Sequence, residues 1–245
     1  MTKRCCFAFL FCFLLSSNFA FAGGWIELSG SQKAYLAVPD WKEQEFFPVV
    51  ILAHGPWGLD REIQRTADRL AEEGFIALAP DFYGGAVIGN EVEAYEKMQT
   101  LITEDVLYLL IETVDFAQDY PRSDPERIGM IGWANGGEFS LNYAVKDLRI
   151  RALVIYYGNI PAGEKTLEGL KIPLLGLYGK KDKSFTLRDV EALWFRLSQL
   201  HKRSTLHLYE KGRFGFDHPR QSGYDPLIAE DAWEKTRVFL KANLA

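Results

Sequence analysis

The stretch Ile128-Gly129-Met130-Ile131-Gly132-Trp133-Ala134-Asn135-Gly136-Gly137 decides how the rest of the chain is interpreted. It contains the spacing Gly-x-Ala-x-Gly, which corresponds to the motif Gly-x-nucleophile-x-Gly at a sharp turn between a strand and a helix. Gly132 and Gly136 fill the glycine positions, where a larger side chain would collide with the adjoining elements. Ala134 stands at the nucleophile position, and a methyl group cannot attack a carbonyl carbon. The sequence therefore predicts a strand-to-helix turn without its nucleophile.

The segments around this stretch alternate between strand and helix patterns. Residues 48–53 form a near-continuous apolar run, which is typical of a strand buried on both faces of a parallel sheet. The predicted strands are 25–28, 34–38, 48–53, 75–79, 127–131, 152–157, 172–178 and 204–209. The predicted helices are 60–73, 136–145, 187–200 and 227–242, and 91–120 is long enough for two more. This order predicts one α/β domain with a mostly parallel sheet and helices on both faces.

Ligands of such sheets bind beyond the carboxyl ends of the strands. The loops expected there are 54–59, 132–136, 179–185 and 212–218. The candidate site residues should therefore come from these four loops.

The amino terminus predicts a secretory signal peptide over residues 1–22, followed by one domain over 23–245. Lys3 and Arg4 provide a positive start, an apolar run follows, and Ala20-Phe21-Ala22 supplies the cleavage pattern. The apolar run ends before Ser16 and is too short to span a membrane, which takes roughly 20 residues. Cleavage after Ala22 predicts a secreted or periplasmic protein without a stable membrane anchor.

Cleavage would also change the composition of the chain. It would remove all three cysteines, Cys5, Cys6 and Cys12, and with them disulfides, thiolate catalysis and cysteine metal sites. It would take the formal net charge from −5 to −7, because Lys3 and Arg4 leave as well. This acidic balance argues against nucleic acid as a partner. The histidines show no metal-ligand spacing, so neither a metal nor a cofactor is expected.

Further segments, in the same order and spacing, resemble the dienelactone hydrolase family of α/β-hydrolases over nearly all of residues 23–245. They are Val49 to Leu52, Gly58-Leu59, Leu70 to Gly74, Ala79 to Tyr83, Ile131-Gly132, Gly136-Gly137, Tyr178 to Asp182, Tyr209, Gly215-Phe216, Tyr224-Asp225 and Ala229 to Thr236. The resemblance implies the α/β-hydrolase fold and a small-molecule ester, lactone or related ligand.

The resemblance also implies a catalytic triad, of which this sequence keeps one member. Members of the family attack an ester or lactone carbonyl with a cysteine or serine, assisted by a histidine base and an aspartate that orients it. The nucleophile position is Ala134, the acid position is Asp182, and the histidine position is Phe214. Two of the three positions are therefore degenerate.

The segment His54-Gly55-Pro56-Trp57-Gly58 resembles an oxyanion loop. A backbone N–H near Trp57 would join the N–H of Asn135 to hold a developing oxyanion. The alternative is a loop whose Trp57 only packs over the pocket. Asp182 has an alternative as well, since an aspartate after Gly179-Lys180-Lys181 can simply cap a turn.

The remaining polar candidates are weaker. His218 is interpreted as a surface histidine rather than a replacement base, Ser140 as a helical serine, and nothing marks Ser184 as activated. One set of aromatic residues is compatible with either a pocket or the core: Trp57, Phe82, Tyr83, Trp133 and Phe214.

Two functions fit this sequence. The favoured hypothesis is a secreted, non-catalytic member that keeps the fold and pocket of an ester or lactone hydrolase. The alternative is an active carboxylic-ester or lactone hydrolase with relocated or water-mediated chemistry around Asp182 and the oxyanion loop. No replacement nucleophile is visible in the sequence, and this favours the first hypothesis.

Overall fold

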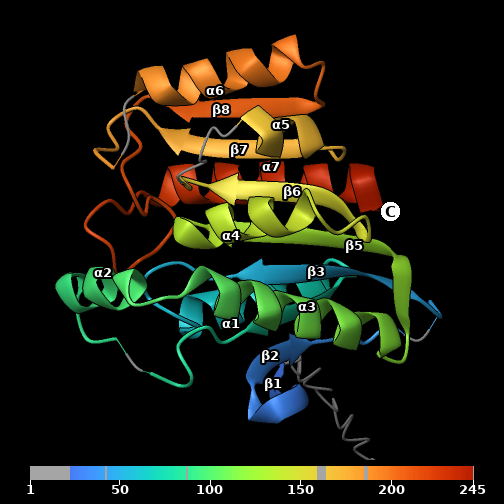
Figure 1. Ribbon diagram of the computed structural model, residues 1–245. Helices are drawn as coiled ribbons and strands as arrows, with labels where there is room; N and C mark the ends of the chain where they lie inside the picture. Colours follow the sequence, from blue (N-terminus) through green and yellow to red (C-terminus); the bar gives the residue numbers. More distant parts are fainter. Residues whose placement is uncertain (1–22, 42, 87, 159–163, 185–186, 245) are drawn as a thin grey trace, which may run out of the picture.

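A computed structural model describes residues 23–41, 43–86, 88–158, 164–184 and 187–244, and the predicted signal peptide lies outside these ranges. Within them, eight strands form one sheet (Figure 1). The strands are β1 (Gly24–Glu27), β2 (Lys33–Ala37), β3 (Phe47–Ala53), β4 (Ile76–Pro80), β5 (Ser123–Trp133), β6 (Ile150–Tyr156), β7 (Leu174–Gly179) and β8 (Ser204–Tyr209). The helices are α1 (Arg61–Glu72), α2 (Glu91–Gln99), α3 (Thr103–Asp119), α4 (Asn135–Ala144), α5 (Glu164–Gly169), α6 (Leu187–Gln199) and α7 (Pro226–Leu244), with a 3-10 turn at Ser29–Ser31.

The strand order is β1-β2-β4-β3-β5-β6-β7-β8. The pairs β1–β2 and β2–β4 are antiparallel, and every later pair is parallel. All seven residues of β3, at the centre of the sheet, are buried, as its apolar run predicts. The predicted fold class is confirmed, and the carboxyl ends of the parallel strands share one edge.

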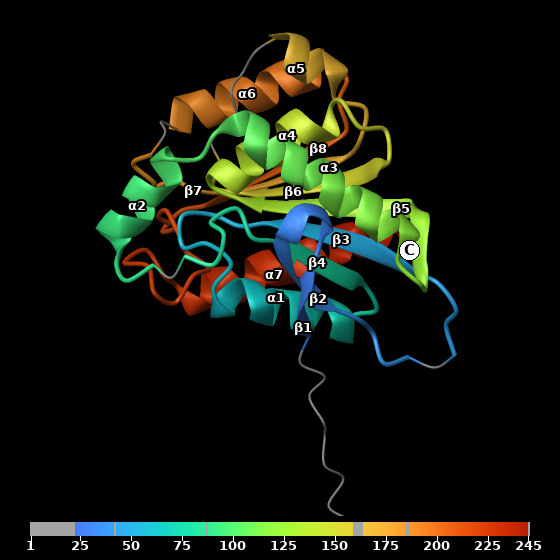
Figure 2. The same ribbon diagram turned by 60° about the horizontal axis from the view of Figure 1, so that its bottom comes forward.

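Helices cover both faces of the sheet (Figure 2). One apolar core lies beneath α3, α4 and α6, with Leu110, Phe139 and Leu193 among its members. The other lies beneath α1 and α7, with Leu70 and Trp233 among its members. No helix in the described ranges is both long and apolar enough to cross a membrane.

Element ends differ slightly from the predictions. The segment 91–120 contains two helices, as predicted, whereas α5 was not predicted. Strand β5 begins at Ser123 rather than at residue 127, because Ser123 pairs with Phe47 across a register irregularity. Pro125 interrupts the apolar pattern there and hides the start of the strand.

Candidate functional site

The predicted strand-to-helix turn lies between β5 and α4, with Ala134 at its apex. Ala134 has φ 51° and ψ −120°, a backbone conformation that non-glycine residues rarely adopt. Its N–H donates to the Tyr156 carbonyl oxygen at 3.0 Å, which ties the turn to β6. A Cβ at Gly132 would lie 2.5 Å from the Gly136 oxygen, and one at Gly136 would lie 2.1 Å from the Ala53 oxygen. The turn thus keeps its strained, closely packed geometry around a methyl group.

Asp182 lies in the loop after β7, and its side chain is buried. Its Oδ1 accepts hydrogen bonds from the Ser184 N–H at 2.8 Å and the Ser184 hydroxyl at 2.6 Å. Its Oδ2 is also buried and has no partner among the described residues. Burial raises the pKa of this carboxyl group, against the opposing effect of the Ser184 bonds. The turn-capping interpretation is therefore confirmed for Oδ1, while Oδ2 leaves room for the acid role that the family resemblance implies.

The unpartnered oxygen leads to a prediction about stability. Because the pKa of Asp182 is raised in the folded state, its ionised form destabilises the fold above the ordinary carboxyl pKa of about 4. Asp182→Asn keeps an oxygen for Ser184 and removes the charge. We expect it to stabilise the fold by on the order of 1 kcal/mol at pH 8, and by less as the pH falls towards the ordinary carboxyl pKa of about 4.

Urea unfolding midpoints measured from about pH 4 to about pH 8 test this prediction. Asp105→Asn is the matched control, because Asp105 is exposed on α3 and its removal should give no such pH-dependent gain. A gain of equal size at both ends of this range would show that ionisation of Asp182 is not the cause.

Phe214 lies in the loop between β8 and α7 and is half-buried. Its ring packs edge-on against Tyr157, with the ring centroids 5.0 Å apart. Tyr157 follows β6 and has φ 36°, so it too is a strained residue. The position that the family gives to histidine is thus filled by an apolar ring, which can neither accept a proton nor donate to Asp182.

The loop after β3 is held by a buried histidine. The Nδ1–H of His54 donates to the Gly55 oxygen at 2.9 Å, and its Nε2 accepts from the Phe82 N–H at 3.0 Å. Burial lowers the pKa of His54, which keeps the ring neutral in this structural role. Trp57 is buried further along the loop, and Asn135 begins α4, where N–H groups lack intrahelical acceptors. The oxyanion role of Trp57 and Asn135 stays a prediction.

A cleft of about 800 Å³ brings Trp57, Asp182 and Phe214 together at the carboxyl edge of the sheet. Ala134 and Asn135 are not among its lining residues. The rest of its wall comes from Pro56, Glu91, Ala94, Tyr95, Lys180, Lys181, Lys183, Arg213, Gln221, Ser222 and Gly223. We call the turn between β5 and α4, with Ala134 at its apex, the elbow. We refer to the space lined by Trp57, Asp182 and Phe214 as the elbow cleft.

The charged residues of the elbow cleft are mostly cationic. Lys180 pairs at 2.5 Å with Glu210, a residue that does not line the cleft. Lys181 and Arg213 have no acidic partner within ion-pair distance among the described residues. The Glu91 carboxylate is engaged by the Ser222 N–H at 2.7 Å. Four cationic side chains therefore face only two carboxyl groups, those of Glu91 and Asp182, beside an apolar wall.

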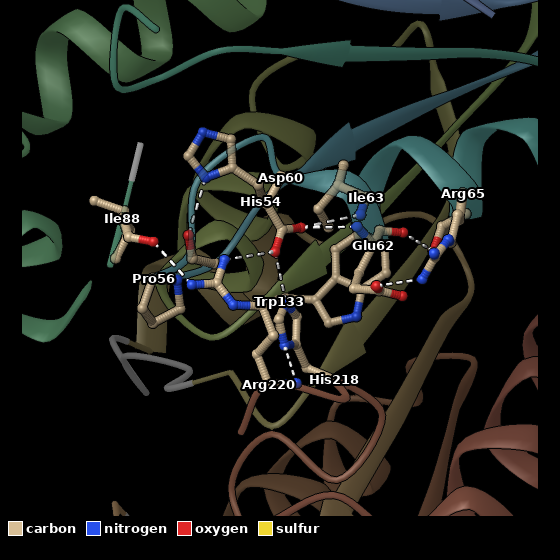
Figure 3. Close-up of polar contacts among 12 residues, drawn as sticks. His54, Pro56, Asp60, Glu62, Ile63, Arg65, Ile88, Trp133, His218 and Arg220 are labelled. Carbon is tan, nitrogen blue, oxygen red and sulfur yellow. Dashed lines mark hydrogen bonds and ion pairs between the residues drawn. The ribbon is translucent and has the colours of Figure 1, made fainter. Parts of the chain in front are cut away.

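The structure corrects the interpretation of His218 as a surface histidine, because its side chain is buried. Its Nε2–H donates to Asp60 Oδ2 at 3.0 Å, and its Nδ1 accepts from the Arg220 N–H at 3.3 Å (Figure 3). Its ring stacks on Trp57 at 5.5 Å, and Asp60 also caps α1 through Oδ1. Both ring nitrogens are engaged, so His218 holds the 217–224 loop against α1 and is not free to act as a base.

The other candidates have structural roles. Ser140 is buried inside α4, as predicted, and the Ser184 hydroxyl donates to Asp182. Phe82 and Tyr83 do not line the elbow cleft but pack against His54, with ring centroids 4.5 and 4.9 Å away.

Sequence reasoning did not single out Asp217. Its Oδ1 accepts from the Tyr157 hydroxyl at 2.6 Å, and its Oδ2 accepts from Trp133 Nε1 at 2.8 Å. Asp217 lies in the loop after β8. Its two bonds connect this loop to Trp133, the residue before Ala134, and to Tyr157, directly after β6. Burial raises the pKa of Asp217. The sequence feature that could have identified Asp217 was its position as an acidic residue directly after the apolar pair Gly215-Phe216.

Comparisons with solved structures agree with this architecture. A Klebsiella pneumoniae structure, provisionally described as a dienelactone hydrolase, matches with a TM-score of 0.81 at 22% identity, over 89% of this chain and 98% of that one. A dienelactone hydrolase-like promiscuous phosphotriesterase from metagenomic libraries matches with a TM-score of 0.80 at 16% identity, over 91% of this chain and 98% of that one. At these identities the two structures establish similarity of fold.

Sequence comparisons go further. "Protein usf" of Aquifex pyrophilus is 30% identical over 221 residues, which span 86% of this chain and 94% of that protein. An Aquifex aeolicus protein, provisionally named a carboxymethylenebutenolidase, is 27% identical over 224 residues and the same shares of the two chains. The model of the dienelactone hydrolase family matches residues 32–244. The chain therefore belongs to the dienelactone hydrolase family.

Proposed function

We propose that this protein is an exported, non-catalytic member of the dienelactone hydrolase family that binds a small molecule in the elbow cleft. One observation carries the non-catalytic part of the proposal: the turn between β5 and α4 keeps its strained backbone and both close-packed glycines around the methyl group of Ala134. A scaffold under no constraint would be expected to relax this strain, which costs on the order of 1–3 kcal/mol. Its retention without a nucleophile supports selection for the shape of the site.

The charge of the elbow cleft supports a ligand class. Lys181, Lys183 and Arg213 stand around an apolar wall formed by Trp57, Phe214 and their neighbours. This combination suits a small, largely apolar ester or lactone that carries a carboxylate. The name of the Aquifex aeolicus relative refers to a lactone of this kind. We extend that class to this chain as a ligand and not as a substrate.

We also propose that the protein is exported from the cytoplasm. The support for export is the three-part pattern of residues 1–22, with Lys3-Arg4 at the start and Ala20-Phe21-Ala22 at the end. We propose a secreted or periplasmic location, which mass spectrometry of the amino terminus of the native protein would test.

Binding without turnover is the expected behaviour. Calorimetric titration with 4-carboxymethylenebut-2-en-4-olide should show saturable binding, while chromatography of the same mixture should show no ring opening above background. A fluorophosphonate should leave the protein unlabelled, because it needs an activated hydroxyl. Lys181→Gln with Arg213→Gln should weaken binding about two- to thirtyfold, the range for two exposed charge contacts.

The control variant is Lys146→Gln, because Lys146 follows α4 at the end remote from the elbow. Turnover of the lactone, or stoichiometric labelling of Ser140 or Ser184, would instead establish an active hydrolase with relocated chemistry. Unchanged binding in the Lys181, Arg213 double variant would remove the elbow cleft as the binding site.

A further inference from the structure

A second cavity adjoins Trp57, on the face of the sheet that α1 and α7 cover. Its volume is about 220 Å³, and it contains none of Ala134, Asp182 and Phe214 in its lining. It is bounded by the 55–58 loop, α1, the ends of β5 and β6, the 217–226 loop and the start of α7. It shares Pro56, Trp57 and Gln221 with the elbow cleft.

The walls of this second cavity are aromatic. Five of the contributing rings are buried, namely Trp57, Trp133, Tyr156, Tyr157 and Trp233, and the exposed Tyr224 also lines the space. Trp133 stacks on Tyr156 with centroids 5.4 Å apart, and Trp57 stacks on His218 at 5.5 Å. We refer to this space as the aromatic cavity. Figure 3 shows Trp133, His218 and the neighbouring Glu62–Arg65 pair.

Most charges of the aromatic cavity are neutralised within the protein. Arg65 pairs with Glu62 at 2.5 Å, and Arg69 pairs with Glu230 at 3.2 Å. The Arg69 guanidinium also lies over the Trp233 ring, 4.2 Å from its centroid. Each of these arginines therefore already has an acidic partner, and neither is left to compensate a further carboxylate.

Among the described carboxylates that line this cavity, Asp217 is the one without an arginine or lysine partner. Its two hydrogen-bond donors, the Tyr157 hydroxyl and Trp133 Nε1, are both neutral. No Lys or Arg lies within ion-pair distance of it among the described residues. His218, next in the chain, is paired with Asp60 at 3.0 Å. Burial raises the pKa of Asp217, against the opposing effects of its two hydrogen bonds and of the neighbouring His218.

We propose that the aromatic cavity binds a small organic cation of the methylated-ammonium class, with Asp217 as its counter-charge. Aromatic faces attract such cations through the negative charge of their π-systems, and desolvation strengthens the attraction. A neighbouring carboxylate adds a direct ionic contact. This site adjoins the elbow cleft, where cationic side chains outnumber carboxyl groups, so the two spaces favour ligands of opposite charge.

The size and chemistry of the cavity limit the ligand further. An apolar cavity of about 150 Å³ holds a benzene molecule, so 220 Å³ suits a ligand slightly larger than benzene. Anions are disfavoured by Asp217. Bare metal cations prefer several oxygen or nitrogen ligands, whereas this space offers one carboxylate among aromatic faces. A compact quaternary ammonium meets both the charge and the shape.

Choline is a suitable probe, and 3,3-dimethylbutan-1-ol is its uncharged isostere. Titration of the full protein with each, followed by tryptophan fluorescence, should show binding of choline at least tenfold tighter than binding of the alcohol. Asp217→Asn should lower the choline affinity at least tenfold. Tyr157→Phe, which keeps the ring in the wall and removes one of the two neutral donors to Asp217, should lower the affinity much less than Asp217→Asn does.

Asp105→Asn again serves as the control for removal of one negative charge, since Asp105 is exposed on α3. The proposal is overturned if the alcohol binds as well as choline, if choline does not bind at all, or if Asp217→Asn binds it unchanged. The first two outcomes are read on the unaltered protein, so they decide the matter even if the Asp217 variant fails to fold.

Discussion

Ala134→Ser combined with Phe214→His is expected to give this protein measurable esterase activity. The serine hydroxyl would stand at the apex of an elbow that already has φ 51° and ψ −120°. The new imidazole would enter the position beside Tyr157 that Phe214 now fills. The expected gain, on activated esters such as 4-nitrophenyl acetate, is on the order of 10²-fold or more over the unaltered protein.

The unpaired oxygen of Asp182 is the reason to expect the two substitutions to act together. Its Oδ2 is buried without a hydrogen-bond partner among the described residues, and Asp182 and Phe214 line the same cleft, so we expect it to accept the N–H of a new His at position 214 and orient the ring. Members of a triad act as a unit, and each single substitution should therefore give much less activity than the pair. Adding Asp182→Asn to the double variant should abolish most of the gain.

The stability of the double variant must be measured with its activity. Loss of the Phe214 ring from its contact with Tyr157 could cost about 1–3 kcal/mol, although the new bond to Asp182 would offset part of this. A variant that folds but remains inert on every ester tested would contradict the prediction. The oxyanion loop or the pocket would then have changed along with the triad.

The sequence predicted those features of the fold that depend on local pattern. The apolar run 48–53 became β3, buried along its whole length, and the spacing of Gly132 and Gly136 located the turn at Ala134. Both signals are local, because burial on two faces demands continuous apolar residues and a tight turn demands glycine. The start of β5 was misplaced, since Ser123 joins the sheet through a register irregularity that no local pattern records.

The site was predictable only where motifs mark it. Asp182 and Phe214 were located by their neighbours in the sequence, and the structure brings both to the elbow cleft. Asp217 and His218 were not understood, because their partners lie far away in sequence: Trp133 and Tyr157 for the first, Asp60 for the second. Burial and pairing of a polar side chain arise from tertiary contacts, which periodicity does not reveal.

Gly136→Ala is expected to cause the largest loss of stability among single substitutions in this region. The added Cβ would lie 2.1 Å from the Ala53 oxygen and 2.5 Å from the His54 oxygen. Both are backbone atoms at the end of the central strand β3, and they cannot withdraw without moving the sheet. We expect a cost of about 3–5 kcal/mol and a Tm lower by on the order of 10 °C.

Gly24→Ala is the matched control for this prediction. A Cβ at Gly24 would meet nothing within 4 Å, so the same chemical change should be neutral or slightly stabilising. Thermal unfolding of the two variants beside the unaltered protein separates steric crowding from the general effect of replacing glycine. If Gly136→Ala unfolds at the same temperature as Gly24→Ala, the elbow is loose. Its strained geometry would then be no evidence that the shape of the site has been kept for binding.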